Sequence, residues 1–320
     1  MKALLEHHAS WLVHHPLSAE DKDSMAAMRA IVEPNKGKSQ GIAARVPFDA
    51  IMAHVSAPVG VVYEADRVGG VSGWWCRPET ARPGQAVMHI HGGWFNWGSA
   101  QAFRHLAGHI AVSAGVAAFV PDYRLAPEHP FPAASEDIRA CYFGLTERGF
   151  SKIAITGDSA GGNLVIELLM HLAATRESGG EAVVGGVAFS PVTDLALSGE
   201  SWSTRAVADP YFTKSQAAEL VHSYLDGHDP EDPFVSPLHA DLRGLVPIRV
   251  HAGNDEVLLD DSVRLVERAV AVGVDARLDV WQGMVHGHLG GIGRLAASTE
   301  NLQLIGEFLI DRFAKAKTEG

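Results

Sequence analysis

The chain has 320 residues, of which 47% are hydrophobic and 20% are charged. These proportions are typical of a globular protein with a large core and exclude an intrinsically disordered one. The formal net charge of −12 argues against nucleic acid and anionic membranes as partners, because both require clustered Lys and Arg.

The compartment is predicted from what the sequence lacks. No run approaches the roughly 20 apolar residues of a membrane span, and the first residues contain no signal-peptide core. We therefore expect a cytoplasmic protein without a membrane partner. Cys76 and Cys141 lie far apart and outside any C-x-x-C pattern, so we expect no disulfide and no zinc site. Both are interpreted as small buried hydrophobic residues.

The predicted elements, taken along the chain, alternate as in an α/β protein. Residues 1–45 favour one or two short helices. Eight strands are then predicted: Val59–Ala65, Gly70–Cys76, Ala86–Ile90, Val116–Val120, Ile153–Thr156, Val183–Phe189, Ile248–Ala252 and Ala276–Trp281. From the third strand onward they alternate with predicted helices: Ala102–Ala114, Ala133–Glu147, Ala160–Ala174, Asp260–Val272 and Thr299–Ala316. This alternation predicts a mostly parallel eight-stranded sheet with helices on both faces.

Two segments interrupt the alternation. One is residues 1–45, and the other is residues 191–247, which carry one predicted helix at Ser215–Leu225. Long excursions between sheet elements are usually lids or binding loops. We predict that these segments together form a helical cap, 1–45 as its N-terminal part and 191–247 as its insertion. The catalytic core would then consist of residues 46–190 and 248–320.

The run GDSAGG at residues 157–162 stands between a predicted strand and a predicted helix. In a G-x-S-x-G turn, small residues let strand and helix pass closely, and the serine hydroxyl stands clear of the sheet. The N–H of Ala160 would point at an oxygen that becomes charged beside that hydroxyl. Ser159 is therefore a candidate nucleophile, although the motif alone also arises by chance and needs a histidine and an acid.

A second motif, HIHGGW at residues 89–94, ends the third predicted strand. Consecutive glycines leave their N–H groups free and let the chain approach a ligand closely. Two glycines after a strand are more often only a turn. However, in a hydrolase whose nucleophile precedes its acid and histidine along the chain, the loop after the third strand is expected to supply the second donor of the oxyanion hole.

These motifs belong to a longer series that runs in order from about residue 60 to 290. Its members are HGG at 91–93, DYRLAPEHPFPAA at 122–134, GDSAGG at 157–162, SPVTDL at 190–195, LLDDS at 258–262 and GMVHG at 283–287. In these residues the chain resembles the hormone-sensitive-lipase-like (GDXG, bacterial family IV) esterases of the α/β-hydrolase superfamily. The resemblance implies the α/β-hydrolase fold and a serine hydrolase that needs no cofactor.

The resemblance also implies a role for His286, which matches the family's catalytic histidine. His288 stands where the family usually has an aromatic residue and is a weaker alternative base. Aligning the family pattern on LLDD at 258–261 places Glu256 at the position of the acid and Asp255 one residue too early. Either carboxylate could orient the imidazole, so both stay open, with Glu256 preferred.

For the oxyanion hole the resemblance implies the backbone N–H groups of Gly92, Gly93 and Ala160. His91 and Asp158 are expected to brace the two loops rather than to react. Five aromatic residues are predicted to line a substrate pocket between cap and core: Trp94, Trp97, Trp202, Tyr211 and Phe212. The pairs His7-His8 and His14-His15 are joined by no carboxylate or cysteine in a metal pattern, so no metal is expected.

The main hypothesis is a carboxylesterase-type hydrolase of small-molecule esters with short acyl or small aryl and alkyl groups. A lactone or small-amide (formamide) hydrolase with the same triad is kept as an alternative, because Trp94 replaces the third glycine of the family's oxyanion loop. A third hypothesis is a non-catalytic small-molecule receptor, but the presence of His286 argues against it. The sequence leaves a homodimer open.

Overall fold

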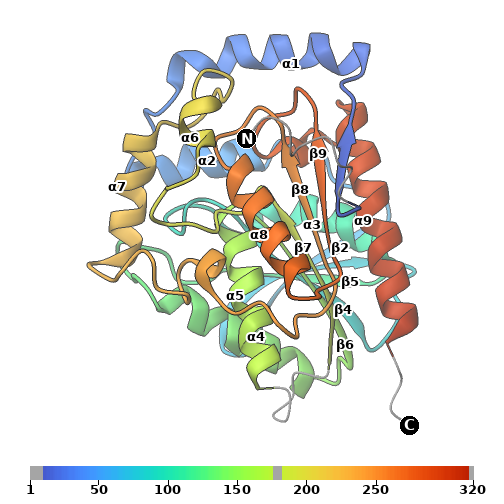
Figure 1. The fold of residues 1–320 in the computed structure, drawn as a ribbon. Coiled ribbons are helices and arrows are strands. Elements are labelled where there is room, and N and C mark those ends of the chain that lie inside the picture. The colour runs from blue at the N-terminus through green and yellow to red at the C-terminus, as the bar shows by residue number, and fades with distance from the viewer. Residues whose placement is uncertain (1–9, 176–181, 317–320) are drawn as a thin grey trace.

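The computed structural model describes residues 10–175 and 182–316, and its centre is a sheet with strand order β1-β9-β8-β7-β6-β4-β5-β3-β2 (Figure 1). The strands are β1 (Leu12–His15), β2 (Val61–Val68), β3 (Val71–Pro78), β4 (Gln85–Ile90), β5 (Ala117–Pro121), β6 (Lys152–Asp158), β7 (Val183–Phe189), β8 (Ile248–Gly253) and β9 (Ala276–Trp281). The pairs β2/β3 and β3/β5 are antiparallel, and the other six pairs are parallel. This architecture confirms the predicted fold class.

The sheet has nine strands instead of the predicted eight, because β1 joins its edge. Leu12 to His15 pair in parallel with Leu278 to Trp281 of β9. The His15 ring stacks on Trp281 at 3.9 Å between ring centroids, and its Nε2 lies 2.8 Å from Asp279 Oδ1. Part of segment 1–45 is therefore sheet. A strand of four residues that ends in two histidines has no alternation long enough to be predicted.

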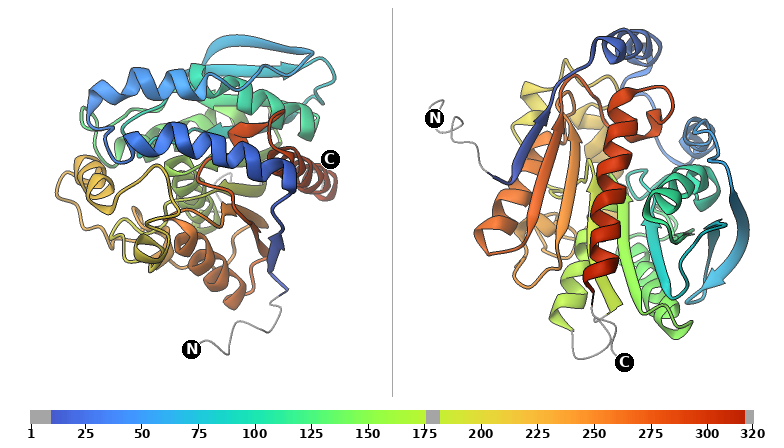
Figure 2. Two further views of the ribbon diagram at one scale, coloured as in Figure 1. Left: turned by 90° about the horizontal axis from the view of Figure 1, so that it is seen from above. Right: turned by 90° about the vertical axis from the view of Figure 1, so that its right-hand side faces the viewer.

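Helices cover both faces of the sheet (Figure 2). They are α1 (Ala19–Val32), α2 (Arg45–Met52), α3 (Ala100–Ala114), α4 (Ala133–Glu147), α5 (Ala160–Ala174), α6 (Ser201–Thr204), α7 (Lys214–Leu225), α8 (Leu259–Ala271) and α9 (Ala296–Lys315). Ile153 and Ile155 of β6 belong to the buried cluster that also contains residues of α4, α5 and α8, whereas Ala154 belongs to the cluster that contains residues of α3 and α9. Successive side chains of a strand point to opposite faces, so both faces of this central strand are apolar and buried.

The helix α1 lies across the end of the molecule at which the parallel strands finish (Figures 1 and 2). Its buried Asp21 accepts hydrogen bonds from the N–H groups of Ala296 and Ala297, at 2.8 and 2.9 Å, and so caps α9. Farther along α1, Arg29 forms an ion pair with Asp255 at 2.8 Å. These contacts hold α1 over the loops that follow β8 and β9.

Candidate active site

Ser159 occupies the sharp turn between β6 and α5 in a strained backbone conformation, with φ 55° and ψ −117°. A non-glycine residue rarely adopts a positive φ, and it persists only when its surroundings fix it. Here the Ser159 N–H donates to the Phe189 carbonyl at 2.8 Å, and the Ser159 carbonyl accepts from the N–H groups of Asn163 and Val192. The neighbouring strand and helix therefore hold the turn.

The glycines of this turn are required by close backbone packing. A Cβ atom at Gly157 would lie 2.6 Å from the Gly161 carbonyl oxygen. A Cβ atom at Gly161 would clash with the carbonyl oxygen of Ile90, the last residue of β4. This is the physical reason for the G-x-S-x-G spacing in this chain, since β4, β6 and α5 meet here with no room for side chains.

His286 follows β9 and lies beside Glu256, which follows β8. Its Nδ1 is 3.9 Å from Glu256 Oε2, and Phe212 packs edge-on against the imidazole at 5.1 Å between centroids. Within the described residues, His286 Nδ1 and Glu256 Oε1 are both buried without a hydrogen-bond partner. Asp255 points elsewhere, because its carboxylate pairs with Arg29 of α1. Of the two predicted acids, only Glu256 lies against His286.

The protonation states follow from burial. Burial lowers the pKa of His286 below its usual value, so its ring is neutral at neutral pH and can accept a proton; the nearby Asp209 opposes this shift. Burial raises the pKa of Glu256. The Ser190 hydroxyl, which donates to Glu256 Oε2 at 2.8 Å, and the Gly253 N–H, which donates to the same oxygen at 3.2 Å, both counteract that rise.

Ser190 is a site residue to which the sequence analysis gave no role. It follows β7, is 2% exposed and has a positive φ of 44°. Its N–H donates to the His251 carbonyl at 2.7 Å, which fixes the residue next to Glu256. The signal that could have indicated it is its place in the SPVTDL run directly after a strand, at the same sheet edge as Ser159.

The loop after β4 supplies fewer free donors than predicted. Gly92 N–H already donates to Asp158 Oδ1 at 3.1 Å, so in this structure it is not free to bind an oxyanion. Gly93 has φ 118°, and a Cβ there would clash with the Trp97 carbonyl, so only glycine fits. Ala160 begins α5, and the first N–H groups of a helix have no acceptor within it. Gly93 and Ala160 are therefore the remaining donors of the predicted set.

Asp158 joins the two loops through the hydrogen bond that it accepts from Gly92 N–H, and His91 braces the loop after β4, which agrees with the role expected for them. His91 Nδ1 lies 2.9 Å from the Gly92 carbonyl, and the Tyr123 hydroxyl donates to the His91 carbonyl at 2.9 Å. The rings of His91 and Tyr123 also stack, with centroids 4.2 Å apart. Burial lowers the pKa of His91 to about 4, so the imidazole is neutral and serves as a packing and hydrogen-bonding group.

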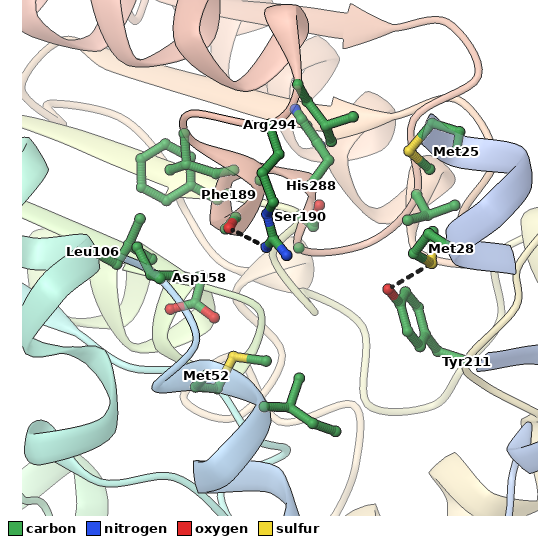
Figure 3. Close-up of a pocket in the computed structure, with 18 of the residues that line it drawn as sticks. Met25, Met28, Met52, Leu106, Asp158, Phe189, Ser190, Tyr211, His288 and Arg294 are labelled. Carbon is green, nitrogen blue, oxygen red and sulfur yellow. Dashed lines mark hydrogen bonds between the residues drawn. The ribbon is translucent and has the colours of Figure 1, made fainter. Parts of the chain in front are cut away.

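A cleft of about 600 Å³ adjoins the turn of Ser159 (Figure 3). Asp158 and Ser190 line it at the sheet, and Met25 and Met28 line it from α1. Its remaining walls come from α2, α3 and the loop after His286, and they are mostly apolar. The cleft is thus bounded by both the core and the segment predicted to belong to the cap.

The structure corrects most of the predicted aromatic lining. Tyr211 does line the cleft and donates its hydroxyl to Met28 Sδ at 3.4 Å, while Phe212 packs on His286. The three tryptophans are interior residues that do not line it: Trp94, Trp97 and Trp202 are 1%, 2% and 5% exposed. Trp94 packs edge-on against Phe212 with centroids 5.4 Å apart, so the aromatic residues of this region bury one another.

His288, the alternative base, also lines the cleft but lacks a carboxylate partner among the described residues. Its Nε2 lies 3.1 Å from Asn301 Nδ2.

In the described part of the chain no three His, Cys, Asp or Glu residues are placed to hold a metal ion. His7 and His8 lie outside the described residues. Cys76 and Cys141 are free and buried.

Known proteins share this fold and much of this sequence. Residues 87–290 match a protein family described as having the alpha/beta hydrolase fold. An acetyl-hydrolase of Streptomyces hygroscopicus is 36% identical over 221 residues, which cover 68% of this chain and 73% of that protein. A crystal structure of an esterase from the bacterial hormone-sensitive lipase family superposes with a TM-score of 0.84 at 36% identity, over 92% of this chain and 98% of the other.

A further solved structure is that of EstE5, from a crystal soaked with p-nitrophenyl butyrate. It superposes with a TM-score of 0.83 at 33% identity, over 93% of this chain and 99% of EstE5. The similarity therefore extends through nearly the whole length of the solved esterases. No helix in the described ranges is long and apolar enough to cross a membrane.

Proposed function

The chain belongs to the hormone-sensitive-lipase-like, family IV branch of the α/β-hydrolase esterases, and we propose that Ser159, His286 and Glu256 are the triad with which it hydrolyses small carboxylic esters. The observation that carries this assignment is the strained turn of Ser159. Such strain is typical of functional sites, and this turn lies at the sheet edge that also carries His286 and Glu256.

In the first half of the reaction, Ser159 Oγ bonds to the ester carbonyl carbon while its proton passes to His286 Nε2, the nitrogen that does not face Glu256. The carbonyl oxygen takes the negative charge and accepts hydrogen bonds from the N–H groups of Gly93 and Ala160. The intermediate then collapses, the bond to the alcohol oxygen breaks, and the alcohol leaves with the proton from His286.

In the second half, water attacks the acyl-enzyme. His286 takes one proton from the water as its oxygen bonds to the carbonyl carbon, and returns that proton to Ser159 Oγ as the acid leaves. Glu256 orients the imidazole and stabilises its cation. The 3.9 Å between His286 Nδ1 and Glu256 Oε2 exceeds a hydrogen bond, but catalytic hydrogen bonds in unliganded sites are often long and tighten in the complex.

We further propose that the substrates have short acyl groups. The cleft of about 600 Å³ lies within the range of small-molecule sites and is too small for a triglyceride with long chains. The ester with which the crystal of the similar EstE5 was soaked, p-nitrophenyl butyrate, also has a short acyl group. Residues 1–45, which contain α1, together with residues 191–247 would form the cap that limits the cleft.

The structure favours neither alternative function. The hypothesis of an amide or lactone hydrolase depends on Trp94 in the oxyanion loop, but the side chain of Trp94 is 1% exposed and does not line the cleft. A receptor without catalysis does not require a histidine and a buried carboxylate side by side. Cytoplasmic location stays a prediction from the sequence, and the sequence leaves a homodimer open.

The test is kinetic. With 4-nitrophenyl butyrate as substrate, Ser159→Ala and His286→Ala should each lower kcat by about 10⁴- to 10⁶-fold. Ser262→Ala is the matched control, because Ser262 is also fully buried, its hydroxyl has no partner among the described residues, and it lies on α8. A Ser159→Ala enzyme with more than a tenth of the wild-type kcat would refute the assignment.

A further inference from the structure

Arg294 lies on the glycine-rich loop between His286 and α9, and its side chain extends into the cleft (Figure 3). Its Nη2 donates to the Gly290 carbonyl at 3.3 Å. Among the described residues, no carboxylate oxygen lies within 4.0 Å of its guanidinium. The other arginine near this end of the cleft, Arg29, is paired with Asp255. Arg294 therefore brings an uncompensated positive charge to the cleft.

The surroundings of Arg294 suit a ligand that is partly apolar and partly anionic. The side chains of Met25, Met28 and Leu106 offer apolar walls, and the Tyr211 hydroxyl lies close enough to Arg294 for the two to interact electrostatically. Asp158 is the other charged residue in the lining, but its carboxylate already accepts the Gly92 N–H. The cleft thus combines an apolar surface with one guanidinium that has no carboxylate partner among the described residues.

We propose that Arg294 is a specificity-determining residue that binds a carboxylate carried by the ester substrate at the end remote from the scissile bond. This inference rests on the proposed ester hydrolysis and names a substrate class for it, the half-esters and ester acids with an apolar spacer. A guanidinium presents a planar pair of N–H donors that matches a carboxylate. With a formal net charge of −12, the chain as a whole repels anions, so a local cation is needed to attract one.

Two pairs of esters test the proposal and also identify the half of the substrate that carries the charge. Monoethyl adipate and ethyl hexanoate differ by a carboxylate on the acyl side. The butyrate ester of 4-hydroxybenzoate and phenyl butyrate differ by a carboxylate on the alcohol side. For each pair, the ratio of kcat/KM for the anionic ester to that for the neutral ester is measured in the wild type, Arg294→Gln and Arg294→Lys.

We expect Arg294→Gln to lower this ratio about 10- to 100-fold for one of the two pairs of esters, because a charge-assisted hydrogen bond is lost. Arg294→Lys keeps the positive charge and should lower the ratio less. Raising the salt concentration should shrink the wild-type preference. Arg268→Gln is the matched control, because Arg268 is exposed, donates to a single backbone carbonyl, that of Ala240, and lies outside the cleft. Arg268→Gln should leave both ratios unchanged.

Two outcomes would overturn the inference. If the wild type cleaves the neutral esters and Arg294→Gln changes neither ratio, the role of Arg294 is wrong while ester hydrolysis stands. If the wild type cleaves none of the four esters, the proposed function fails first and the inference fails with it. Unfolding temperatures of all variants are measured alongside, so that a loss of folding is recognised as such.

Discussion

The turn that carries Ser159 and the cleft wall that faces it are built in different ways. At the turn, backbone atoms of β4, β6 and α5 approach so closely that Gly157 and Gly161 can carry no side chain. The facing wall includes long side chains from α1 and from the loop after His286, among them Met25, Met28 and Arg294. The reaction chemistry depends on rigid backbone, whereas substrate choice depends on adjustable side chains.

This difference has a physical basis. A nucleophile and its oxyanion donors must be placed within a fraction of an ångström, which close backbone packing achieves. Methionine is unbranched and flexible, so a wall that contains several methionines adapts to ligands of different shape. We therefore expect substitutions at the turn to abolish activity in general, and substitutions at the wall to change which ester is preferred.

The largest effect is expected from Gly161→Ala. The added Cβ would clash with the Ile90 carbonyl, and because that neighbour is backbone it cannot rotate away. We expect the free energy of unfolding to fall by about 2–3 kcal/mol, as for overpacked cores, with most activity lost. Denaturant unfolding and 4-nitrophenyl butyrate turnover measure the two effects.

Gly290→Ala is the matched control at the wall. A Cβ at Gly290 would meet only Val55 Cγ2 at 3.8 Å, an ordinary contact, so stability should change by less than about 0.5 kcal/mol. Equal stability losses in the two variants would show that the contrast between turn and wall is wrong.

The next largest effect concerns the acid. Glu256→Gln removes the carboxylate beside His286 and should lower kcat by about 10⁴-fold. Asp255→Asn breaks only a partly exposed ion pair with Arg29, which contributes at most about 1 kcal/mol. Steady-state kinetics of the two neighbouring variants compare them directly, and a larger loss in Asp255→Asn would reassign the acid.

A smaller effect is expected for Ser190→Ala. The Ser190 hydroxyl stabilises the ionised Glu256, so its removal raises the pKa of Glu256 further above its usual value. Catalysis needs the ionised carboxylate, so kcat should fall about 10-fold at pH 7, and the acidic limb of its pH profile should move to higher pH. If kcat falls by the same factor at every pH and the acidic limb of its pH profile does not move, the role of Ser190 is purely structural.

Much of the core could be predicted from the sequence because its signals are local. The eight predicted strands are all present, and β7 and β9 have the predicted bounds, since apolar runs between turn residues mark buried strands. The strand β1 was missed because its pairing with β9 depends on residues more than 260 positions away. The motif around Ser159 was visible because a strained turn admits only certain residues.

The cleft wall could not be predicted in the same way. Trp94, Trp97 and Trp202 were expected in the pocket, but the sequence does not show whether an aromatic residue packs inward or faces a ligand. Met25, Met28 and Arg294 belong to no motif, and they meet only because α1 lies against the loop after His286. Residues that are brought together by long-range packing form no local sequence pattern.

Labelling with a fluorophosphonate tests the central claim most directly, because it reports whether Ser159 is an activated nucleophile. The wild type should gain one adduct by intact mass, peptide mapping should place it on Ser159, and Ser159→Ala should gain none. Glu256→Gln should be labelled far more slowly than Asp255→Asn. An adduct on another residue, or an unlabelled wild type that still cleaves 4-nitrophenyl butyrate, would contradict the account.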